Sequence, residues 1–268
     1  MFDPNNETFN LKEKQVHVWL TFLEEIKSPC LLNYYWDLLS GEEQARCERF
    51  SFQTHKEEYL ISHAMLRTVL AAYTNILPQR LEFYRQAYGR PELISDSSWM
   101  RKIRFNLSHT NGVVLFALAW DREIGVDVEQ NTRNLKLLEI TNRFFTRREI
   151  EVLQHLPDDS RQNRFFEFWT LKESYFKALG KGLHIPLDEV GFYISEKEPK
   201  EIFFNTSIAE DTKNRQFWLF NPAVNFTAAI TVSRKKNENL ELNIWNTIPL
   251  QSVHSHDCAL ITSGNLSE

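Results

Sequence analysis

Apolar and polar residues alternate along several short segments of the chain, as they do in strands that bury one face. The first such segment is VHVWLTF at residues 16–22. We expect further strands at residues 81–88, 103–108, 113–120, 124–129, 190–195, 216–220, 226–232 and 240–245. Short runs of this kind, separated by turn residues, predict small and mainly antiparallel sheets.

Helical periodicity fills the intervals between these strands. It predicts helices around residues 41–50, from 54 to about 77, from 147 onward, and over about 161–179. Thr54 with Glu57, and Thr146 with Glu149, have the spacing of a capping box, in which each side chain bonds the other's backbone N–H. These two pairs therefore predict where two of the helices begin.

The order of the predicted elements divides the chain into two similar halves. Each half consists of a strand, a long helix and then several strands. We predict a leader at 1–14, a first α+β half at 15–121, a second at 122–245, and a tail at 246–268. The similarity concerns the order of elements only, because no repeat of individual residues is visible. The tail is rich in Ser, Thr, Asn and His, and is expected to be loosely ordered or to lie over the surface.

Composition narrows the class of protein. The 268 residues, 42% hydrophobic and 25% charged, suit one large or two small soluble domains. A net charge of −5 gives no electrostatic reason to expect nucleic-acid binding, and no stretch is apolar enough to span a bilayer. The chain starts with polar and acidic residues instead of a secretory signal, and its three cysteines are scattered. A reducing, cytoplasmic location is expected.

Candidate chemistry begins with GVDVEQ at residues 125–130. Side chains two apart on a strand point to the same face, so Asp127 and Glu129 should project together while their apolar neighbours face the core. A solvated acidic face would explain this pattern equally well. However, two close carboxylates repel unless a cation or a proton lies between them. The pair is therefore a candidate metal site.

A third carboxylate follows in WTLKESYFKALGKGL at 169–183. Glu173 and Lys177 lie one helical turn apart, which by itself describes a common surface ion pair worth about 0.3–0.5 kcal/mol. Three carboxylates can hold a hard divalent cation, and a nearby lysine can neutralise phosphate. Lys172 falls inside the apolar stripe of the helix, where it must find a partner or serve the site.

These two segments together resemble the signature of the 4′-phosphopantetheinyl transferases, specifically the larger, surfactin-synthetase-activating type. The resemblance covers roughly residues 40–195. It implies that Asp127, Glu129 and Glu173 hold Mg²⁺ and that Lys177 contacts the phosphates of coenzyme A. RFFTRREI at 143–150 resembles another family segment, but Glu149 already has a structural role as a capping-box partner.

Two turn segments resemble phosphate contacts of the same family. FNLSHTNG at 105–112 offers Ser108 and His109, whose hydroxyl and imidazole can donate to phosphate oxygens. GRP at 89–91 offers Arg90, a fork-shaped donor. Without the resemblance, the first would be a turn that closes a hairpin and the second an exposed arginine.

A third segment, EEQARCERF at 42–50, resembles a family segment near the coenzyme A 3′-phosphate and offers Arg46. This chain departs from the family pattern at Glu43, where a basic residue is expected and where the glutamate can cap a helix together with Ser40. It departs again at Tyr59, where some relatives have threonine. Arg67 matches a recurrent family arginine, although a helical arginine is more often a surface charge.

The resemblance implies an α+β enzyme of two pseudo-twofold-related halves, each a small sheet packed on a long helix, with the active site in the cleft between them. The enzyme would transfer 4′-phosphopantetheine from coenzyme A to a serine of an apo acyl- or peptidyl-carrier protein, and release adenosine 3′,5′-bisphosphate. Glu173 or a metal-bound water would accept the serine proton. We expect a monomer, because both halves belong to one chain.

Two other classes stay open at this point. The chain could be a non-enzymatic module that binds coenzyme A or a carrier protein, and such a module would tolerate loss of the three acids. It could also be a Mg²⁺-dependent phosphohydrolase, which would release phosphate with no carrier present. The three acids are intact, which favours the transferase.

Overall fold

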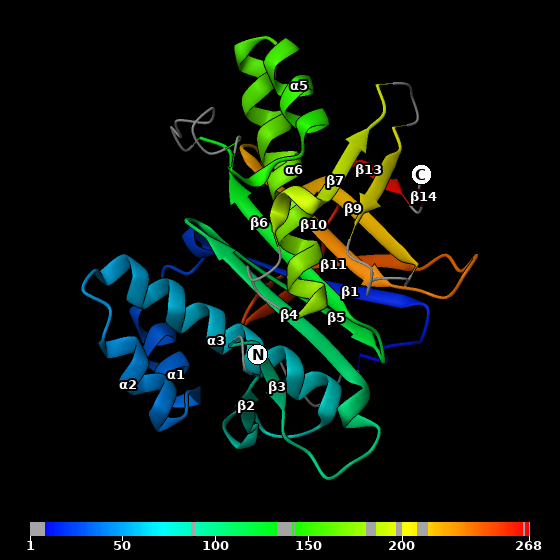
Figure 1. The fold of residues 1–268 in the computed structure, drawn as a ribbon. Helices are drawn as coiled ribbons and strands as arrows, with labels where there is room; N and C mark the ends of the chain where they lie inside the picture. Colours follow the sequence, from blue (N-terminus) through cyan, green and yellow to red (C-terminus); the bar gives the residue numbers. More distant parts are fainter. Residues whose placement is uncertain are drawn as a thin grey trace. The chain divides into compact units, whose positions relative to one another are not determined.

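The computed structural model in Figure 1 describes residues 9–86, 89–132, 141, 143–180, 186–196, 200–207, 214–264 and 266–267. The chain divides into two compact units. Unit 1 comprises residues 1–121 and 241–257, and unit 2 comprises residues 122–240 and 258–268. The first stretch of unit 1 ends at Asp121, next to the predicted seam, and the unit takes in a second stretch from Glu241 to Asp257. Helices and strands mix in both units, which confirms the predicted α+β class.

Unit 1 is built on a five-stranded sheet with the order β12-β11-β1-β5-β4. Its strands are β1 (Gln15–Phe22), β4 (Ile103–Thr110), β5 (Val113–Trp120), β11 (Glu241–Ile248) and β12 (Ser252–Ser255). The pairing of β1 with β11 is parallel, and the other pairings are antiparallel. A separate small ladder joins β2 (Phe83–Arg85) to β3 (Pro91–Leu93).

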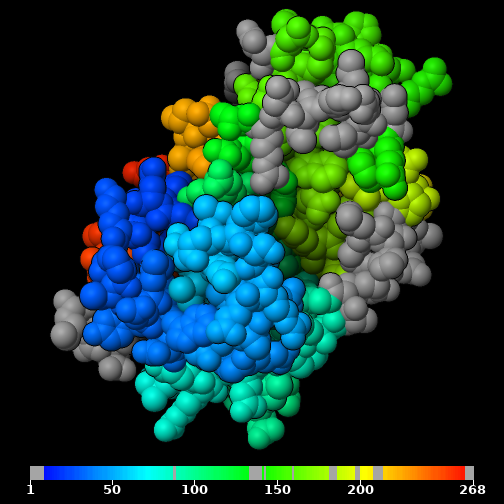
Figure 2. Space-filling view, turned by 90° about the vertical axis from the view of Figure 1, so that its left-hand side faces the viewer, coloured from blue at the N-terminus to red at the C-terminus, as the bar shows by residue number. Residues whose placement is uncertain are grey.

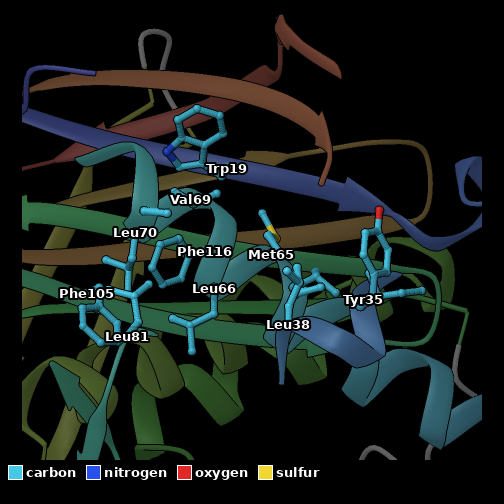
Figure 3. Packing of buried hydrophobic residues seen from close by; sticks show 14 of the residues in the cluster. Trp19, Tyr35, Leu38, Met65, Leu66, Val69, Leu70, Leu81, Phe105 and Phe116 are labelled. Carbon is cyan, nitrogen blue, oxygen red and sulfur yellow. The ribbon is translucent and has the colours of Figure 1, made fainter. Parts of the chain in front are cut away.

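Helices α1 (Pro29–Leu38), α2 (Gly41–Glu48) and α3 (Gln53–Thr74) belong to the same unit, together with the short 3-10 helices η1 (Leu23–Glu25), η2 (Pro78–Arg80) and η3 (Met100–Lys102). Buried side chains of α3, such as Met65, Leu66 and Leu70, lie with Trp19 and Phe116 of the sheet in one core (Figure 3). Burying a side chain of this size stabilises the fold by roughly 1.5–3 kcal/mol. The core therefore holds α3 to its sheet.

Unit 2 contains an antiparallel sheet with the order β13-β9-β10-β6. Its strands are β6 (Ile124–Gln130), β9 (Arg215–Asn221), β10 (Phe226–Ser233) and β13 (Ala259–Gly264). A second sheet has the order β14-β8-β7, from β7 (Val190–Ile194), β8 (Ile202–Thr206) and β14 (Leu266–Ser267). Helix α5 (Arg147–His155) is followed by α6 (Asp158–Leu179), which lies along β6 and β10, while η5 (Leu187–Glu189) precedes β7 (Figure 1).

Several predicted boundaries are wrong. The tail is not loose: β12 pairs with β11, and β13 pairs with β9, because an open sheet edge offers backbone hydrogen bonds that even a polar segment can use. The last predicted strand, at 240–245, belongs to unit 1 because β11 pairs with β1. Within the segment 81–88, the only strand among the described residues is β2.

The two predicted capping boxes have different outcomes. Thr146 and Glu149 form theirs at the start of α5, as predicted. The box predicted for Thr54 and Glu57 is wrong, because α3 begins one residue earlier and Phe52 occupies the N-cap position. Glu57 instead accepts a hydrogen bond from the Gln53 side chain, at 2.9 Å. Among the helices that the structure describes, none is long and apolar enough to cross a membrane.

The two units share an arrangement of strands and helices that goes beyond the similar order of their predicted elements. In each, the first strand pairs antiparallel with a later strand, which pairs in turn with the strand that precedes it in the chain: β1-β5-β4 in unit 1 and β6-β10-β9 in unit 2. In each, a helix of 22 residues, α3 or α6, follows a short helix that begins with a capping box. Both long helices end at a residue with positive φ, Asn75 or Gly180.

The correspondence extends to one pair of residues in each unit, although no repeat of individual residues is visible in the sequence. In unit 1, Glu43 of the Ser40 capping box forms an ion pair with Arg67, the fifteenth residue of α3. In unit 2, Glu149 of the Thr146 capping box forms an ion pair with Lys172, the fifteenth residue of α6. The two partners are 24 residues apart in unit 1 and 23 in unit 2, and one cation is arginine while the other is lysine, so the sequence shows no simple repeat.

Candidate active site

The acidic strand of unit 2 has the predicted orientation. Val126 and Val128 are buried in β6, while Asp127 and Glu129 alternate with them. Only 4% of Asp127 is exposed, whereas Glu129 is half-buried. The two carboxylates therefore occupy one face of β6, at the end of the strand where burial gives way to solvent.

Gly125 allows α6 to lie unusually close to this strand. A Cβ atom at Gly125 would stand 2.0 Å from the Ser174 carbonyl oxygen and 2.3 Å from the Ala178 backbone nitrogen. No side chain fits into such a space. The Ser174 hydroxyl also lies 2.8 Å from the hydroxyl of Thr231 on β10. The helical turn that carries Glu173 and Lys177 is thereby held beside Asp127.

Lys177 contacts the acidic strand directly. Its ammonium donates to Asp127 Oδ1 at 2.6 Å, and the lysine side chain is 30% exposed while that of Asp127 is 6% exposed. Lys177 thus has a partner on the strand, 50 residues earlier in the sequence, besides the i,i+4 neighbour Glu173 that the spacing suggested.

Glu173 has a strongly altered acidity. Burial and the neighbouring negative charge of Asp127 raise the pKa of Glu173 to about 7. The positive charge of Lys177 acts in the opposite direction, and Glu129 adds a further upward contribution. Two neighbouring carboxylates thus act on Glu173, which is held partly protonated near neutral pH.

The donor set fits a hard divalent cation, because all three candidate ligands are carboxylates. No group of three or more His, Cys, Asp or Glu side chains among the described residues is arranged so that it could hold a metal ion as it stands. Lys177 lies on Asp127 and supplies the positive charge there. A metal ion could bind these three carboxylates only if side chains around Asp127 rotated.

Lys172 is not placed to contact a cofactor, which corrects that part of the prediction. Its side chain is fully buried, and its ammonium lies 2.8 Å from Glu149. It also donates to the Leu187 carbonyl oxygen at 2.9 Å and to the Val190 carbonyl oxygen. Burial raises the pKa of Glu149 and lowers the pKa of Lys172, and the partner's charge opposes each shift.

Three candidate phosphate contacts belong to unit 1. Ser108 is buried on β4, and the next residue, His109, has 47% of its side chain exposed. The His109 Nδ1 atom lies 2.8 Å from a carboxylate oxygen of Glu58 on α3. Arg90 is 8% exposed and donates to the Phe105 carbonyl oxygen at 3.0 Å. His109 is therefore the most accessible of the three candidates.

The segment predicted for the 3′-phosphate gives a mixed result. Arg46 is exposed on α2, which belongs to the blue and cyan surface of Figure 2. Glu43 caps α2 with Ser40, as the sequence suggested. Arg67 is not a surface charge: it is 2% exposed and donates to Glu43 at 2.8 Å. Tyr59 is buried, which with the charge of Glu43 raises its pKa to about 12.

Comparison with known proteins agrees with the motifs. The model of the 4′-phosphopantetheinyl transferase superfamily matches residues 123–231, and the model of the 4′-phosphopantetheinyl transferase N-terminal region matches residues 28–120. The chain is 33% identical to the 4′-phosphopantetheinyl transferase HetI of Nostoc sp. over 74% of this chain and 82% of the relative. It is 29% identical to the 4′-phosphopantetheinyl transferase gsp of Aneurinibacillus migulanus over 67% and 71%.

Among solved structures, a holo-(acyl-carrier-protein) synthase from Bacillus anthracis in complex with CoA is similar, with a TM-score of 0.35 and 21% identity. The match covers 41% of this chain and 94% of the synthase chain. The family matches and the HetI comparison show that the chain belongs to the 4′-phosphopantetheinyl transferase family. Its enzyme class is accordingly that of the 4′-phosphopantetheinyl transferases.

Proposed function

We propose that the protein transfers 4′-phosphopantetheine from coenzyme A to a serine hydroxyl of an apo acyl- or peptidyl-carrier protein, with Mg²⁺, and releases adenosine 3′,5′-bisphosphate. The observation that carries the proposal is the corner of unit 2 where Lys177 meets Asp127 beside Glu173. A binding module would have no use for a base, a cation and a carboxylate cluster. A Mg²⁺-dependent phosphohydrolase could use the same groups, and the family to which the chain belongs favours transfer over hydrolysis.

Asp127, Glu129 and Glu173 would hold the metal ion, since carboxylate oxygens are the ligands that Mg²⁺ prefers. When bound, Mg²⁺ would supply charge stabilisation to the pyrophosphate of coenzyme A. Burial raises the pKa of Glu173 most, and the charges of Asp127 and Glu129 raise it further; a cation between the three acids would relieve this second contribution, which supports the assignment.

Lys177 would stabilise the phosphate of the departing adenosine 3′,5′-bisphosphate. Its flexible stem lets the ammonium leave Asp127 and reach a pyrophosphate oxygen, where a positive charge stabilises the negative charge that develops. Arg46, Arg90, Ser108 and His109 are proposed as further contacts to the phosphates of coenzyme A. Lys172 is removed from this set because of its burial.

Glu173 is the proposed base. The serine oxygen would form a bond to the phosphorus that carries the pantetheine, and the bond from that phosphorus to the departing adenosine bisphosphate would break. The serine proton would pass to the Glu173 carboxylate. The pKa of Glu173 is raised to about 7 without a metal ion, and a bound cation would lower it, so Glu173 would be ionised and able to accept the proton. A water molecule could accept the proton in place of Glu173.

We also propose a monomer that works in a reducing cytoplasm. Both units come from one chain, and the three cysteines, Cys30, Cys47 and Cys258, are too scattered along the sequence to form a disulfide framework. A light-scattering mass equal to two or three chains would contradict the monomer.

Intact mass spectrometry of an apo carrier protein incubated with this protein, coenzyme A and Mg²⁺ tests the reaction. A mass gain of one phosphopantetheine group, lost with EDTA and with Glu173→Gln, is the expected result. No gain on fatty-acid and peptide-synthetase carriers, from a folded protein that binds coenzyme A, would favour the binding module. Release of phosphate without a carrier would favour the hydrolase.

A further inference from the structure

The ion pair of Lys172 with Glu149 is the centre of a fully buried polar network. Both side chains are 0% exposed, and their charged groups lie 2.8 Å apart. Glu149 also accepts hydrogen bonds from the Thr146 backbone at 2.8 Å and from the Phe192 backbone at 2.9 Å. Because Lys172 donates to carbonyl oxygens of Leu187 and Val190, the network ties α6 to the start of α5 and to β7.

The next turn of α6 is held from β6 and β10. Gly125 lets the backbone of α6 approach β6, and Ser174 bonds to Thr231 of β10. Glu173 follows Lys172 directly in the sequence. Lys177 lies five residues after Lys172 on the same helix. The network and the glycine contact together leave the turn that carries Glu173 and Lys177 little freedom to rotate or slide.

A buried ion pair is a costly way to stabilise a helix. Removing two charges from water costs several kcal/mol per ion, and well-packed apolar side chains often stabilise a core as well or better. What such a pair supplies is directional contact, since every donor and acceptor must find its partner. A directional contact next to reactive groups can therefore fix where those groups lie.

We propose that Lys172 and Glu149 are positioning residues that set the place of Glu173 and Lys177 against Asp127. The inference rests on the proposed function, because the effect of this placement is measured as the rate of phosphopantetheine transfer. Neither residue touches substrate, since both are fully buried. Their effect passes through α6.

Unit 1 supplies a matched control within the same chain. Arg67 lies 2.7 Å from Glu43, and it donates to the Pro78 and Leu81 carbonyl oxygens that follow α3. Arg67 and Lys172 also lie over aromatic rings, each at 5.3 Å from the ring centroid. In unit 1, Thr68 and Ala72 stand in the places of Glu173 and Lys177, so α3 carries no candidate metal ligand at these positions. Glu43 lies on α2 with Arg46, a proposed coenzyme A contact, so the two units are compared by Mg²⁺ requirement and kcat and not by KM for coenzyme A.

The experiment compares Glu149→Gln and Lys172→Met with Glu43→Gln and Arg67→Met. Glutamine at this position can still complete a capping box, so the two glutamine variants keep their helix starts. Lys172→Arg, which copies unit 1, tests rescue by a conserved charge. For each variant, urea unfolding establishes the folded fraction, followed by kcat, KM for coenzyme A and the Mg²⁺ concentration for half-maximal rate. Binding of Mn²⁺ to the free protein is measured by electron paramagnetic resonance.

We expect Glu149→Gln and Lys172→Met to lower kcat at least about tenfold and to raise the Mg²⁺ requirement under conditions where they are folded, since small misplacements of reacting groups cost about this much or more. Lys172→Arg should recover part of the loss. Glu43→Gln and Arg67→Met should lower the urea midpoint comparably, with the Mg²⁺ requirement unchanged.

If folded Glu149→Gln keeps wild-type kcat, Mg²⁺ requirement and Mn²⁺ binding, the pair is structural only and the inference is wrong. Equal kinetic losses in both units would overturn it as well, because the effect would then be one of general stability. A wild-type protein that transfers nothing to any carrier contradicts the proposed function instead. Loss of Mn²⁺ binding in Glu149→Gln would still support the positioning role in that case.

Discussion

In unit 1 the first strand, β1, presents His17 and Trp19 to one tyrosine of the long helix α3. The His17 Nδ1 atom lies 2.6 Å from the Tyr73 hydroxyl, and the Trp19 indole donates to the same hydroxyl at 3.2 Å. In unit 2 the first strand, β6, presents Asp127 to Lys177 of α6 at 2.6 Å. VHVW at 16–19 and VDVE at 126–129 thus hold corresponding places, with aromatic residues in one unit and acids in the other.

These two contacts, His17 and Trp19 with Tyr73 in unit 1 and Asp127 with Lys177 in unit 2, differ in charge and not in architecture. Burial lowers the pKa of His17 to about 4, so the unit 1 corner is neutral at physiological pH. In unit 2, burial and neighbouring acids raise the pKa of Glu173 to about 7, so charge is crowded there. The same strand, capped helix and buried ion pair support both. Function therefore depends on which side chains stand on a shared scaffold.

Among the variants that distinguish the two units, replacement of Asp127 should have the largest effect on transfer. Asp127→Asn removes the partner of Lys177 and a proposed metal ligand, so transfer should fall on the order of 10³-fold while the fold is kept. The measurement is kcat/KM for carrier modification, with urea unfolding alongside. His17→Asn, at the corresponding place in β1, is the control: it should cost about 1–2 kcal/mol of stability and leave the Mg²⁺ dependence unchanged. A loss under tenfold in Asp127→Asn would argue against the metal assignment.

A methyl group at Gly125 should separate α6 from β6. Gly125→Ala places a Cβ 2.0 Å from the Ser174 carbonyl oxygen, which forces the backbone apart and should cost about 3 kcal/mol in the free energy of unfolding. Gln15 has the corresponding place in β1, and Gln15→Ala should change stability by no more than about 0.5 kcal/mol. Urea unfolding of both variants makes the comparison. Equal stability of the two would show that the close approach is not essential.

Removal of Lys177 should act on metal affinity and on transfer in opposite directions. Lys177→Met takes away the positive charge that lies on Asp127, so the free protein should bind Mg²⁺ about tenfold more tightly, as expected for loss of a partly exposed ion pair. Transfer should fall, because the phosphate loses its cation. Titration calorimetry without coenzyme A gives the affinity, and Lys177→Arg should resemble wild type. Weaker metal binding in Lys177→Met would contradict the proposed exchange of cations.

The smallest expected effect is a pH dependence of stability in EDTA. The pKa of Glu173 is about 7 in the folded protein against 4.5 as its ordinary value, so the folded state holds this proton more tightly than the unfolded state. Its contribution to the free energy of unfolding is therefore full below pH 4.5 and is lost as the pH rises to about 7, by roughly 1 kcal/mol after solvent screening. Urea unfolding at pH 5 and pH 8 measures it. Glu173→Gln should show a smaller difference than wild type, and Mg²⁺ should remove it.

Local patterns in the sequence predicted much of the fold. The apolar run at 113–120 is β5 to the residue, and the Thr146 capping box marks the start of α5. The alternation in GVDVEQ placed Asp127 on a half-buried strand. These successes share a cause, since periodicity and capping depend on residues fewer than about four positions apart. Pairing of the tail strands depends on an open edge elsewhere in the fold, so composition alone predicted it wrongly.

The sequence by itself determined the family, the α+β class and which acids are available for chemistry, because each of these is written in short motifs. The tertiary structure decided what each charged side chain does. Lys172 and Lys177 lie on the same helix, yet one is buried against Glu149 and the other reaches Asp127. Those partners lie 23 and 50 residues away in the chain, and only the packing of α6 against α5 and β6 brings them within bonding distance.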